Sequence, residues 1–80
     1  MSIRLVLVDD HAVVRSGLRI LLASEPDVEI VGEAGTGAEA LAVARATTPD
    51  VVLMDIGLPD RSGIEVTRAL KADLPGTAVV

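Results

Sequence analysis

Three aspartates have the placement that metal and phosphoryl chemistry would need. Asp9 and Asp10 directly follow the apolar run 3–8, and Asp55 is the last residue of a second apolar run, 50–55. Carboxylates gathered in a small space repel one another unless a cation or protons intervene. Oxygen ligands with little room favour Mg²⁺, and a carboxylate can also act as a nucleophile that forms an aspartyl phosphate. The pattern therefore predicts a nucleophile, Asp55, beside one Mg²⁺ held by the other two acids.

These acids converge only if the two apolar runs are neighbouring strands. Apolar runs bounded by turn residues predict strands over 3–8, 28–33, 50–55 and from Thr77 onward. Helical spacing and stop signals predict helices over 11–24, from 36 to 47 and from 63 to about 73. The order βαβαβαβ is typical of an α/β fold with a parallel sheet. In such sheets, ligands bind beyond the carboxyl ends of the strands, where the strand order reverses.

The residue pattern of each element also predicts its place. Residues 50–55 are almost wholly apolar before the final acid, which favours the centre of the sheet, whereas 28–33 alternate with polar residues, as an edge strand does. Asp10 is placed to cap the first helix. Thr36 and Ser62 each stand three residues before a glutamate, which predicts two capping boxes.

The composition excludes several classes of protein. The chain has 80 residues and a net charge of −5, and it contains no Phe, Tyr, Trp or Cys. An acidic chain without aromatic side chains is poorly suited to bind nucleic acid. The lack of cysteine suits a cytoplasmic protein, and no apolar run is long enough to span a membrane. Eighty residues form one small domain, and the unfinished last strand suggests a piece of a longer protein.

Other polar and glycine-rich features are better explained by local structure. Residues 35–37 read Gly-Thr-Gly after a strand, but without the full dinucleotide-binding pattern they predict a tight turn and a cap. His11 has no second histidine to pair with, so we expect a first-turn helix residue near the mouth of the site. Arg15 and Arg19 lie one turn apart, which is typical of a solvated face, and Met54 is expected to pack in the core.

These motifs together resemble the receiver domain of bacterial two-component response regulators. The resemblance covers all 80 residues and is carried by the acid pair at 9–10 and by the run Met-Asp-Ile-Gly-Leu-Pro at 54–59, followed by Gly63 and Glu65. Residues 8–11, 14–18 and 31–34 are similar, more narrowly, to the NarL/FixJ subfamily. Members of that subfamily usually carry a LuxR-type helix-turn-helix output domain after the receiver.

The resemblance implies a fold and a role for individual residues. The fold would be a flavodoxin-like (CheY-like) doubly wound parallel sheet, truncated after the start of strand four, with residues 1–80 as the N-terminal part of a receiver. Asp55 would be the phosphoacceptor, and a sensor histidine kinase would supply the phosphoryl group. The chain would therefore not be an enzyme. Asp10 would bind Mg²⁺ directly and Asp9 through a water. Further contributions would come from the backbone carbonyl of Gly57, as a metal ligand, and from Pro59 and Gly63, which would shape the loop.

The chain departs from the family pattern in its missing last third. Receivers carry a Ser or Thr after strand four and a Lys after strand five, and both couple the phosphoryl group to the switch. Neither is present, because the chain stops at Val80. Lys71 is not that lysine, since it lies in the predicted third helix. We therefore expect this chain alone to phosphorylate poorly or not to switch, and its open strand to favour a homodimer or swapped oligomer. DNA would be bound only through a C-terminal domain absent from the chain, while Asp60 and Arg61 are interpreted as loop residues or modulators of access.

Two other functions remain open on the same residues. One is a Mg²⁺-dependent phosphotransferase or phosphatase with an aspartyl nucleophile, although such an enzyme normally has a second Asp where this chain has Gly57. The other is a pseudo-receiver that binds partners without phosphate chemistry. The three acids argue against the second alternative, because a site free of phosphate chemistry has no need of them.

Overall fold

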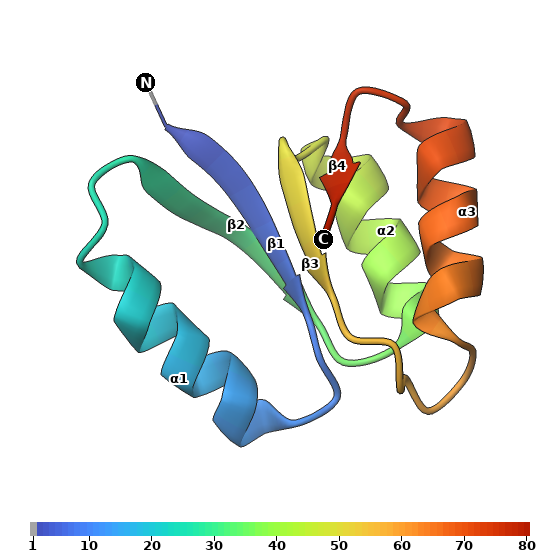
Figure 1. The fold of residues 1–80 in the computed structure, drawn as a ribbon, viewed down its shortest axis with the longest axis horizontal. Helices are drawn as coiled ribbons and strands as arrows, with labels where there is room; N and C mark the ends of the chain where they lie inside the picture. Colours follow the sequence, from blue (N-terminus) through green and yellow to red (C-terminus); the bar gives the residue numbers. More distant parts are fainter. Residues whose placement is uncertain (1) are drawn as a thin grey trace.

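The apolar runs of the sequence form one parallel four-stranded sheet with a helix after each of the first three strands (Figure 1). A computed structural model describes residues 2–80. The strands are Ile3–Val8 (β1), Val28–Ala34 (β2), Val51–Met54 (β3) and Ala78–Val79 (β4). The helices are Ala12–Ala23 (α1), Gly37–Thr47 (α2) and Gly63–Asp73 (α3). The predicted βαβαβαβ order and α/β class are confirmed.

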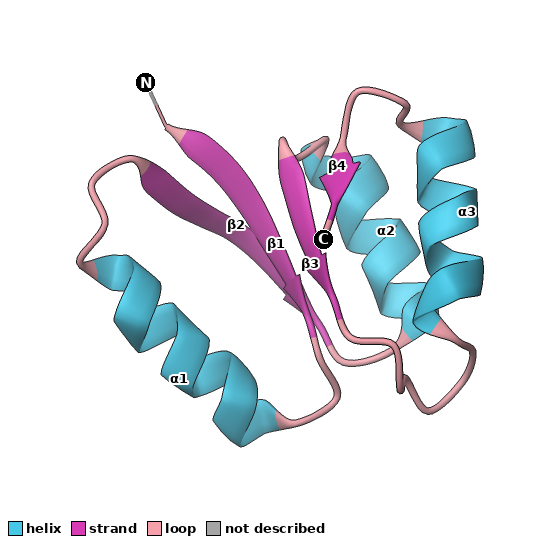
Figure 2. Ribbon diagram, in the orientation of Figure 1, coloured by secondary structure: helices cyan, strands magenta, loops and turns pink. Residues whose placement is uncertain are grey.

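The strand order is β2-β1-β3-β4, with every neighbouring pair parallel (Figure 2). The chain thus adds β2 on one side of β1 and β3 on the other, so the order reverses at β1. This confirms that the first and third strands are neighbours, that the second is an edge strand and that the third is interior. Within residues 2–80, β4 pairs with β3 on one side only.

The register between strands brings their carboxyl ends to one level. Val8 pairs with Ala34 on one side and with Met54 on the other. The backbone continues this pairing beyond the strands, because the amide of Asp9 donates to Ala34 (3.0 Å) and the amide of Asp55 donates to Val8 (2.9 Å). The acids after β1 and β3 therefore leave the sheet side by side.

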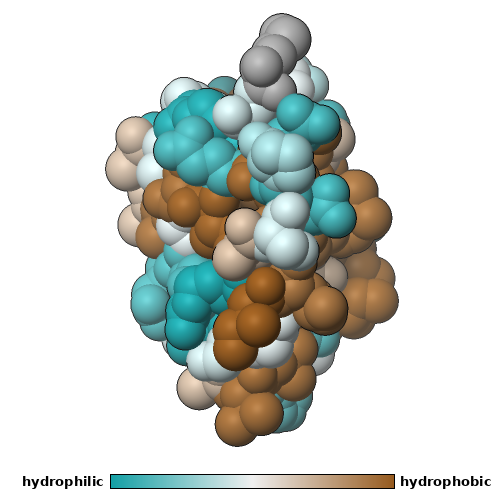
Figure 3. Space-filling model, turned by 90° about the vertical axis from the view of Figure 1, so that its left-hand side faces the viewer, coloured by the Kyte–Doolittle hydropathy of each residue, from teal (hydrophilic) through white to brown (hydrophobic). Residues whose placement is uncertain are grey.

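The helices divide between the two faces of the sheet (Figure 1). α2 and α3 cover one face, where Val6, Val52, Val66 and Leu70 are fully buried in a continuous apolar core. α1 alone covers the other face, and none of its residues between Ala12 and Ala23 is buried. Val13, Ile20 and Leu21 of α1 are largely exposed, and Figure 3, which views the molecule from this side, shows apolar surface among the polar groups. None of the helices within residues 2–80 is long and apolar enough to cross a membrane.

Two of the three helices begin at the capping residue that was predicted from the sequence. Thr36 and Ser62 accept the amide protons of Glu39 and Glu65, as predicted, and so begin α2 and α3. The prediction that Asp10 caps α1 is wrong. The N-cap residue is His11, which makes no side-chain cap hydrogen bond, and its own amide proton is accepted by the carboxylate of Asp9.

The remaining differences are at element ends. The third strand, Val51–Met54, is shorter than the predicted 50–55, and the Asp50 carboxylate before it accepts the backbone amide of Arg4 (2.8 Å). The fourth begins one residue after Thr77, which is buried with its hydroxyl donating to the carbonyl of Pro49 (2.7 Å). The residue before each of these strands is thus bonded to a residue far away in the sequence.

The core beneath α3 should determine stability far more than the exposed side of α1. Leu70→Ala removes a fully buried side chain and should lower the free energy of unfolding by about 2–5 kcal/mol. The matched control is Leu21→Ala, since Leu21 is a helical leucine that is 70% exposed, and it should change stability by only about 0.5 kcal/mol. Urea unfolding followed by circular dichroism measures both, and equal losses would contradict the assignment of the core.

Candidate functional site

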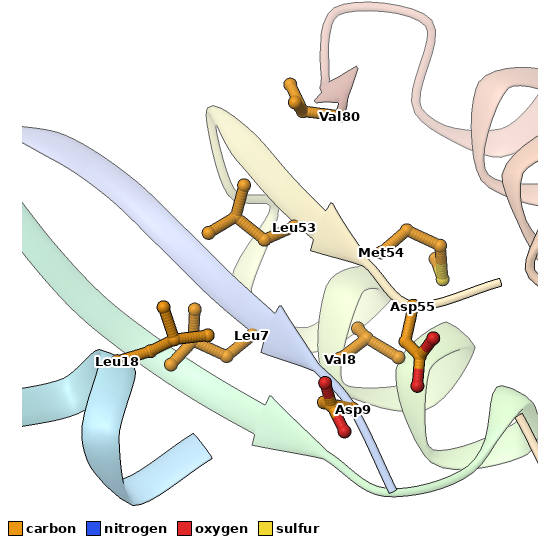
Figure 4. Close-up of a pocket in the computed structure, with 8 residues that line it drawn as sticks. All are labelled: Leu7, Val8, Asp9, Leu18, Leu53, Met54, Asp55 and Val80. Atoms are coloured by element: carbon orange, nitrogen blue, oxygen red, sulfur yellow. The ribbon is translucent and has the colours of Figure 1, made fainter. Parts of the chain in front are cut away.

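Two loops at the carboxyl edge of the sheet bring the predicted acids together. Asp9, Asp10 and His11 come from the β1–α1 loop and Asp55 from the start of the β3–α3 loop. One ligand atom of each of the four residues lies within 4.8 Å of the others. Figure 4 shows the carboxylates of Asp9 and Asp55 beyond the ends of β1 and β3. The convergence predicted for these acids is therefore present.

Asp9 is the most tightly held of the acids. Its Oδ1 accepts the backbone amide of His11 at 2.8 Å and lies 2.9 Å from Nδ1 of the same histidine, and its side chain is only 19% exposed. The hydrogen bond from the His11 amide, reinforced by the nearby imidazole, holds the pKa of Asp9 below its ordinary value despite partial burial. This carboxylate is therefore fixed in place and negatively charged.

His11 lies between two carboxylates. Its Nδ1 is 2.9 Å from Oδ1 of Asp9 and 3.0 Å from Oδ1 of Asp10, while most of the ring is exposed. The hydrogen bond to Asp9, followed by the charge of Asp10, raises the pKa of His11 above its ordinary value of 6.5. The residue lies at the mouth of the site, as predicted, although it precedes the first turn of α1 rather than lying in it. When protonated, it partly neutralises the acids.

The backbone after β3 fixes the third acid. Oδ1 of Asp55 accepts the amide of Gly57 at 3.1 Å, and the amide of Gly63 donates to the carbonyl of Ile56 at 3.0 Å, which closes the loop. A Cβ on Gly63 would lie 2.5 Å from the carbonyl oxygen of Asp55. Gly63, which also begins α3 as expected, is therefore required for a close approach of α3 to the backbone of the acid.

Asp9 and Asp55 form the polar end of an open groove. Its other lining residues are Leu7, Val8, Leu18, Leu53, Met54 and Val80 (Figure 4). The groove lies on the α1 side of β1 and β3, and Met54 also packs against the core, as predicted. Two of the acids thus border an apolar groove.

Comparison with known proteins identifies the family. Residues 5–80 match the response regulator receiver domain family. The chain belongs to this family. The predicted resemblance to two-component receivers is therefore confirmed, together with the CheY-like type of fold.

Individual relatives support the narrower resemblance to NarL/LuxR-type regulators. The receiver is 46% identical over 77 residues to the uncharacterised transcriptional regulatory protein YhcZ of Bacillus subtilis, covering 96% of this chain and 36% of the relative. It is 42% identical over 80 residues to the response regulator VraR of Staphylococcus aureus, covering 100% of this chain and 38% of the relative. The chain thus spans little more than a third of the length of these curated relatives.

Solved structures agree on the fold. A LuxR-family response regulator from Aurantimonas sp. has a TM-score of 0.92 and 40% identity, covering 99% of this chain and 56% of that one. The signal receiver domain of NarL from Mycobacterium tuberculosis has a TM-score of 0.90 and 38% identity, covering 98% of this chain and 63% of that one. The family and the fold therefore rest on both sequence and structure.

The donor atoms of the receiver site suit Mg²⁺. Octahedral Mg²⁺ places neighbouring oxygen ligands about 3 Å apart and opposite ones about 4 Å apart. The carboxylate oxygens of Asp9, Asp10 and Asp55 lie within 4.8 Å of one another, so movements of about an ångström would bring them into range. All three are oxygen donors of the hard type that Mg²⁺ prefers, and His11 would have to yield its place between two of them.

Asp60 has a defined role that the sequence did not reveal. Its carboxylate accepts the amides of Gly37 (2.7 Å) and Ala38 (3.0 Å) at the start of α2. The bond from Gly37 is the main reason that the pKa of Asp60 lies below its ordinary value. Asp60 thus ties the loop after β3 to α2, a contact across 22 and 23 residues that no local sequence signal indicates.

The expectation that Arg15 and Arg19 form a solvated face is wrong for Arg15, whereas Arg19 is exposed, as expected. Both contact Glu33 on β2, and the side chain of Arg15 is only 23% exposed. Arg15 Nη1 also donates to the backbone carbonyl of Asp9. Arg15 is therefore part of the packing between α1 and β2 next to the acids, while Arg19 adds an ion pair to Glu33 from the exposed surface.

The close approach at Gly63 gives a test of the site backbone. Gly63→Ala should lower the free energy of unfolding by about 1–3 kcal/mol, because its methyl group would push α3 away from Asp55. Gly17→Ala is the matched control, since a Cβ there meets nothing within 4 Å, and helix propensity should raise stability by about 0.5–1 kcal/mol. Thermal unfolding distinguishes the two, and a neutral Gly63→Ala would show that the loop is looser than described.

The acids around His11 should be visible in its titration. The chain has a single histidine, so its ring signals in NMR need no assignment. We expect its pKa to lie above 6.5 without metal and to fall towards that value in Asp9→Asn. Because the folded pKa is raised, the stabilisation from protonated His11 is present below pH 6.5 and is lost as the pH rises through the folded pKa. An unshifted pKa would place the ring away from the carboxylates.

Proposed function

We propose that Asp55 accepts a phosphoryl group from a sensor histidine kinase, with Mg²⁺ bound at Asp9, Asp10 and Asp55, in the cytoplasm. The observation that carries this proposal is the convergence of three carboxylates within 4.8 Å at the switch point of a receiver sheet. Carboxylates this close are costly unless a cation is shared among them. The roles proposed for the Gly57 carbonyl, as a further ligand, and for Pro59, in shaping the loop, follow from the family pattern.

The chemistry proposed for Asp55 is a balanced transfer. One carboxylate oxygen forms a bond to phosphorus while the bond between phosphorus and the kinase histidine nitrogen breaks. The electron pair stays on that nitrogen, which takes a proton from solvent. Because Oδ1 of Asp55 accepts the Gly57 amide, we assign the attack to Oδ2. Bound Mg²⁺ would supply positive charge to offset the repulsion between the carboxylate and the phosphoryl group.

The proposed consequence is a switch rather than turnover of a substrate. Phosphorylation would replace the single negative charge of the Asp55 carboxylate with about two on the phosphoryl group, and this change would repack the loops around it. We propose that these 80 residues are the N-terminal part of a receiver, because they span only 56% and 63% of the two solved chains described above. DNA binding through a C-terminal output domain is a proposal that rests on the transcriptional regulators among the relatives. A homodimer or swapped oligomer is a proposal that rests on β4, which pairs on one side only within residues 2–80.

Mass spectrometry of the intact chain tests the acceptor. After incubation with phosphoramidate and Mg²⁺, we expect a gain of one phosphoryl group that is lost in Asp55→Asn and without Mg²⁺. Asp27→Asn is the matched control, because Asp27 is an exposed aspartate before β2, at the opposite edge of the sheet from the acids. It should leave the gain unchanged.

The same experiment separates the alternatives. The proposal would be supported if this chain is labelled slowly and a chain extended to the length of its relatives is labelled fast. The difference in labelling rate would then be due to the added segment. No labelling of either chain would overturn the proposal in favour of a phosphate-independent module. Continuous release of phosphate at an enzyme-like rate would instead indicate a phosphatase.

A further inference from the structure

Arg15 contacts the loop that carries two of the proposed metal ligands. It lies in the first half of α1, with its backbone amide donating to the carbonyl of His11 at 3.1 Å. Its side chain turns back along the helix, and Nη1 donates to the backbone carbonyl of Asp9. That carbonyl belongs to the peptide group between Asp9 and Asp10. A hydrogen bond that fixes the direction of this carbonyl also fixes the planar peptide group, and with it the ψ angle of Asp9 and the φ angle of Asp10.

The guanidinium of Arg15 is itself held in place from β2. Oε1 of Glu33 lies 3.4 Å from Nε of Arg15, and Oε2 of Glu33 contacts Nη1 of Arg19. Glu33 is opposite Leu7 in the sheet, one residue before the pair that aligns the ends of β1 and β2. The anchor for Arg15 is therefore part of the rigid sheet rather than of a loop.

Two observations indicate that the position of Arg15 is specific. A Cβ on Gly35 would lie 3.2 Å from Nη1 of Arg15 and 4.0 Å from the carbonyl oxygen of Asp9, so a larger residue would crowd this contact. In addition, Nε of Arg15 is buried without a hydrogen-bond partner among residues 2–80. A solvated arginine would avoid that cost, so the other contacts must hold the side chain there.

We propose that Arg15 is a positioning residue for the metal-binding acids: through the carbonyl of Asp9 it holds the Asp9–Asp10 peptide group in the orientation that Mg²⁺ binding requires. The inference rests on the proposed function and adds to it a residue outside the ligand set. Groups that orient metal ligands without touching the metal commonly change metal affinity by about 10- to 100-fold.

Charge and positioning predict opposite results for this residue. Arg15 carries a positive charge close enough to lower the pKa of Asp9, so by charge alone its removal should strengthen the binding of a cation. By positioning, its removal frees the peptide group and should weaken binding. The sign of the change in Mg²⁺ affinity therefore distinguishes the two.

The experiment is a Mg²⁺ titration of the 80-residue chain, followed by the backbone amide signals of the β1–α1 and β3–α3 loops in NMR. Arg15→Gln should weaken Mg²⁺ binding about tenfold or more, with Arg15→Lys between it and the unaltered chain. The matched control is Arg19→Gln. It also removes a positive charge that pairs with Glu33, but it leaves the hydrogen bond from Arg15 to the Asp9 carbonyl in place. It should change affinity by less than about twofold.

A metal-free measurement accompanies the titration. The amides of residues 10–12 should exchange with solvent faster in Arg15→Gln than in Arg19→Gln, because only the first variant frees the Asp9–Asp10 peptide group. If Arg15→Gln does not fold, Gly35→Ala crowds the same contact without changing the charge and should weaken Mg²⁺ binding in the same direction.

Equal or tighter Mg²⁺ binding in Arg15→Gln, or in Gly35→Ala where that variant replaces it, would overturn the role of Arg15 and leave the proposed function intact. A loss of affinity as large in Arg19→Gln would also overturn it, since the effect would then belong to Glu33 or to the packing of α1. Absence of Mg²⁺ binding in the unaltered chain would overturn the proposed metal site and the inference with it.

Discussion

Backbone hydrogen bonds on both sides of β1 determine where the acids meet. The amide of Asp9 is bonded to β2 and the amide of Asp55 is bonded to the last residue of β1, so neither acid can shift along its strand without breaking the ladder. In a parallel sheet a slip of one residue would also turn each side chain to the opposite face. The distances among the carboxylates are thus a property of the sheet register, and the loops only complete them.

That constraint creates a concentration of negative charge which the surrounding residues must offset. His11 lies between two of the acids, the Gly57 amide donates to the third, and Arg15 approaches from the far side of the β1–α1 loop. These groups are hydrogen-bond donors or positive charges near the carboxylates, so they partly offset the negative charge, and those that occupy carboxylate oxygens, such as His11, must make way for a bound cation. The negative charge of the acids is therefore partly offset, and the site remains open to an added ligand.

Much of the fold could be predicted from the sequence, because it depends on local signals. Apolar runs, caps and stops indicated the order of the elements, and the acids at strand ends indicated the edge where they meet. Most of the differences concern contacts between residues that are distant in the sequence. Asp10 is a local exception, because α1 begins one residue later than predicted and its N-cap residue is His11. Asp60 and Arg15 looked like loop and surface residues because their partners lie on other elements.

The family pattern supplied what local signals could not. The residues alone suggested Asp55 as a nucleophile beside Mg²⁺ but left the class of protein open, and the match over residues 5–80 closed that question. The direction of the Arg15 side chain could be predicted neither from local signals nor from the family pattern. It depends on the room left at Gly35 and on the facing glutamate of β2, and neither is visible until the chain is folded.

The absence of buried residues in α1, from Ala12 to Ala23, has a thermodynamic consequence. A helix held by partly exposed side chains and ion pairs can detach at a lower cost than the core opposite it. Detachment would carry Arg15 away from the Asp9 carbonyl, so the ordered loop and the docked helix belong to one cooperative unit. Any ligand that binds only the ordered loop must then also stabilise the docked helix, and fluctuations of α1 must reduce the apparent affinity of the site.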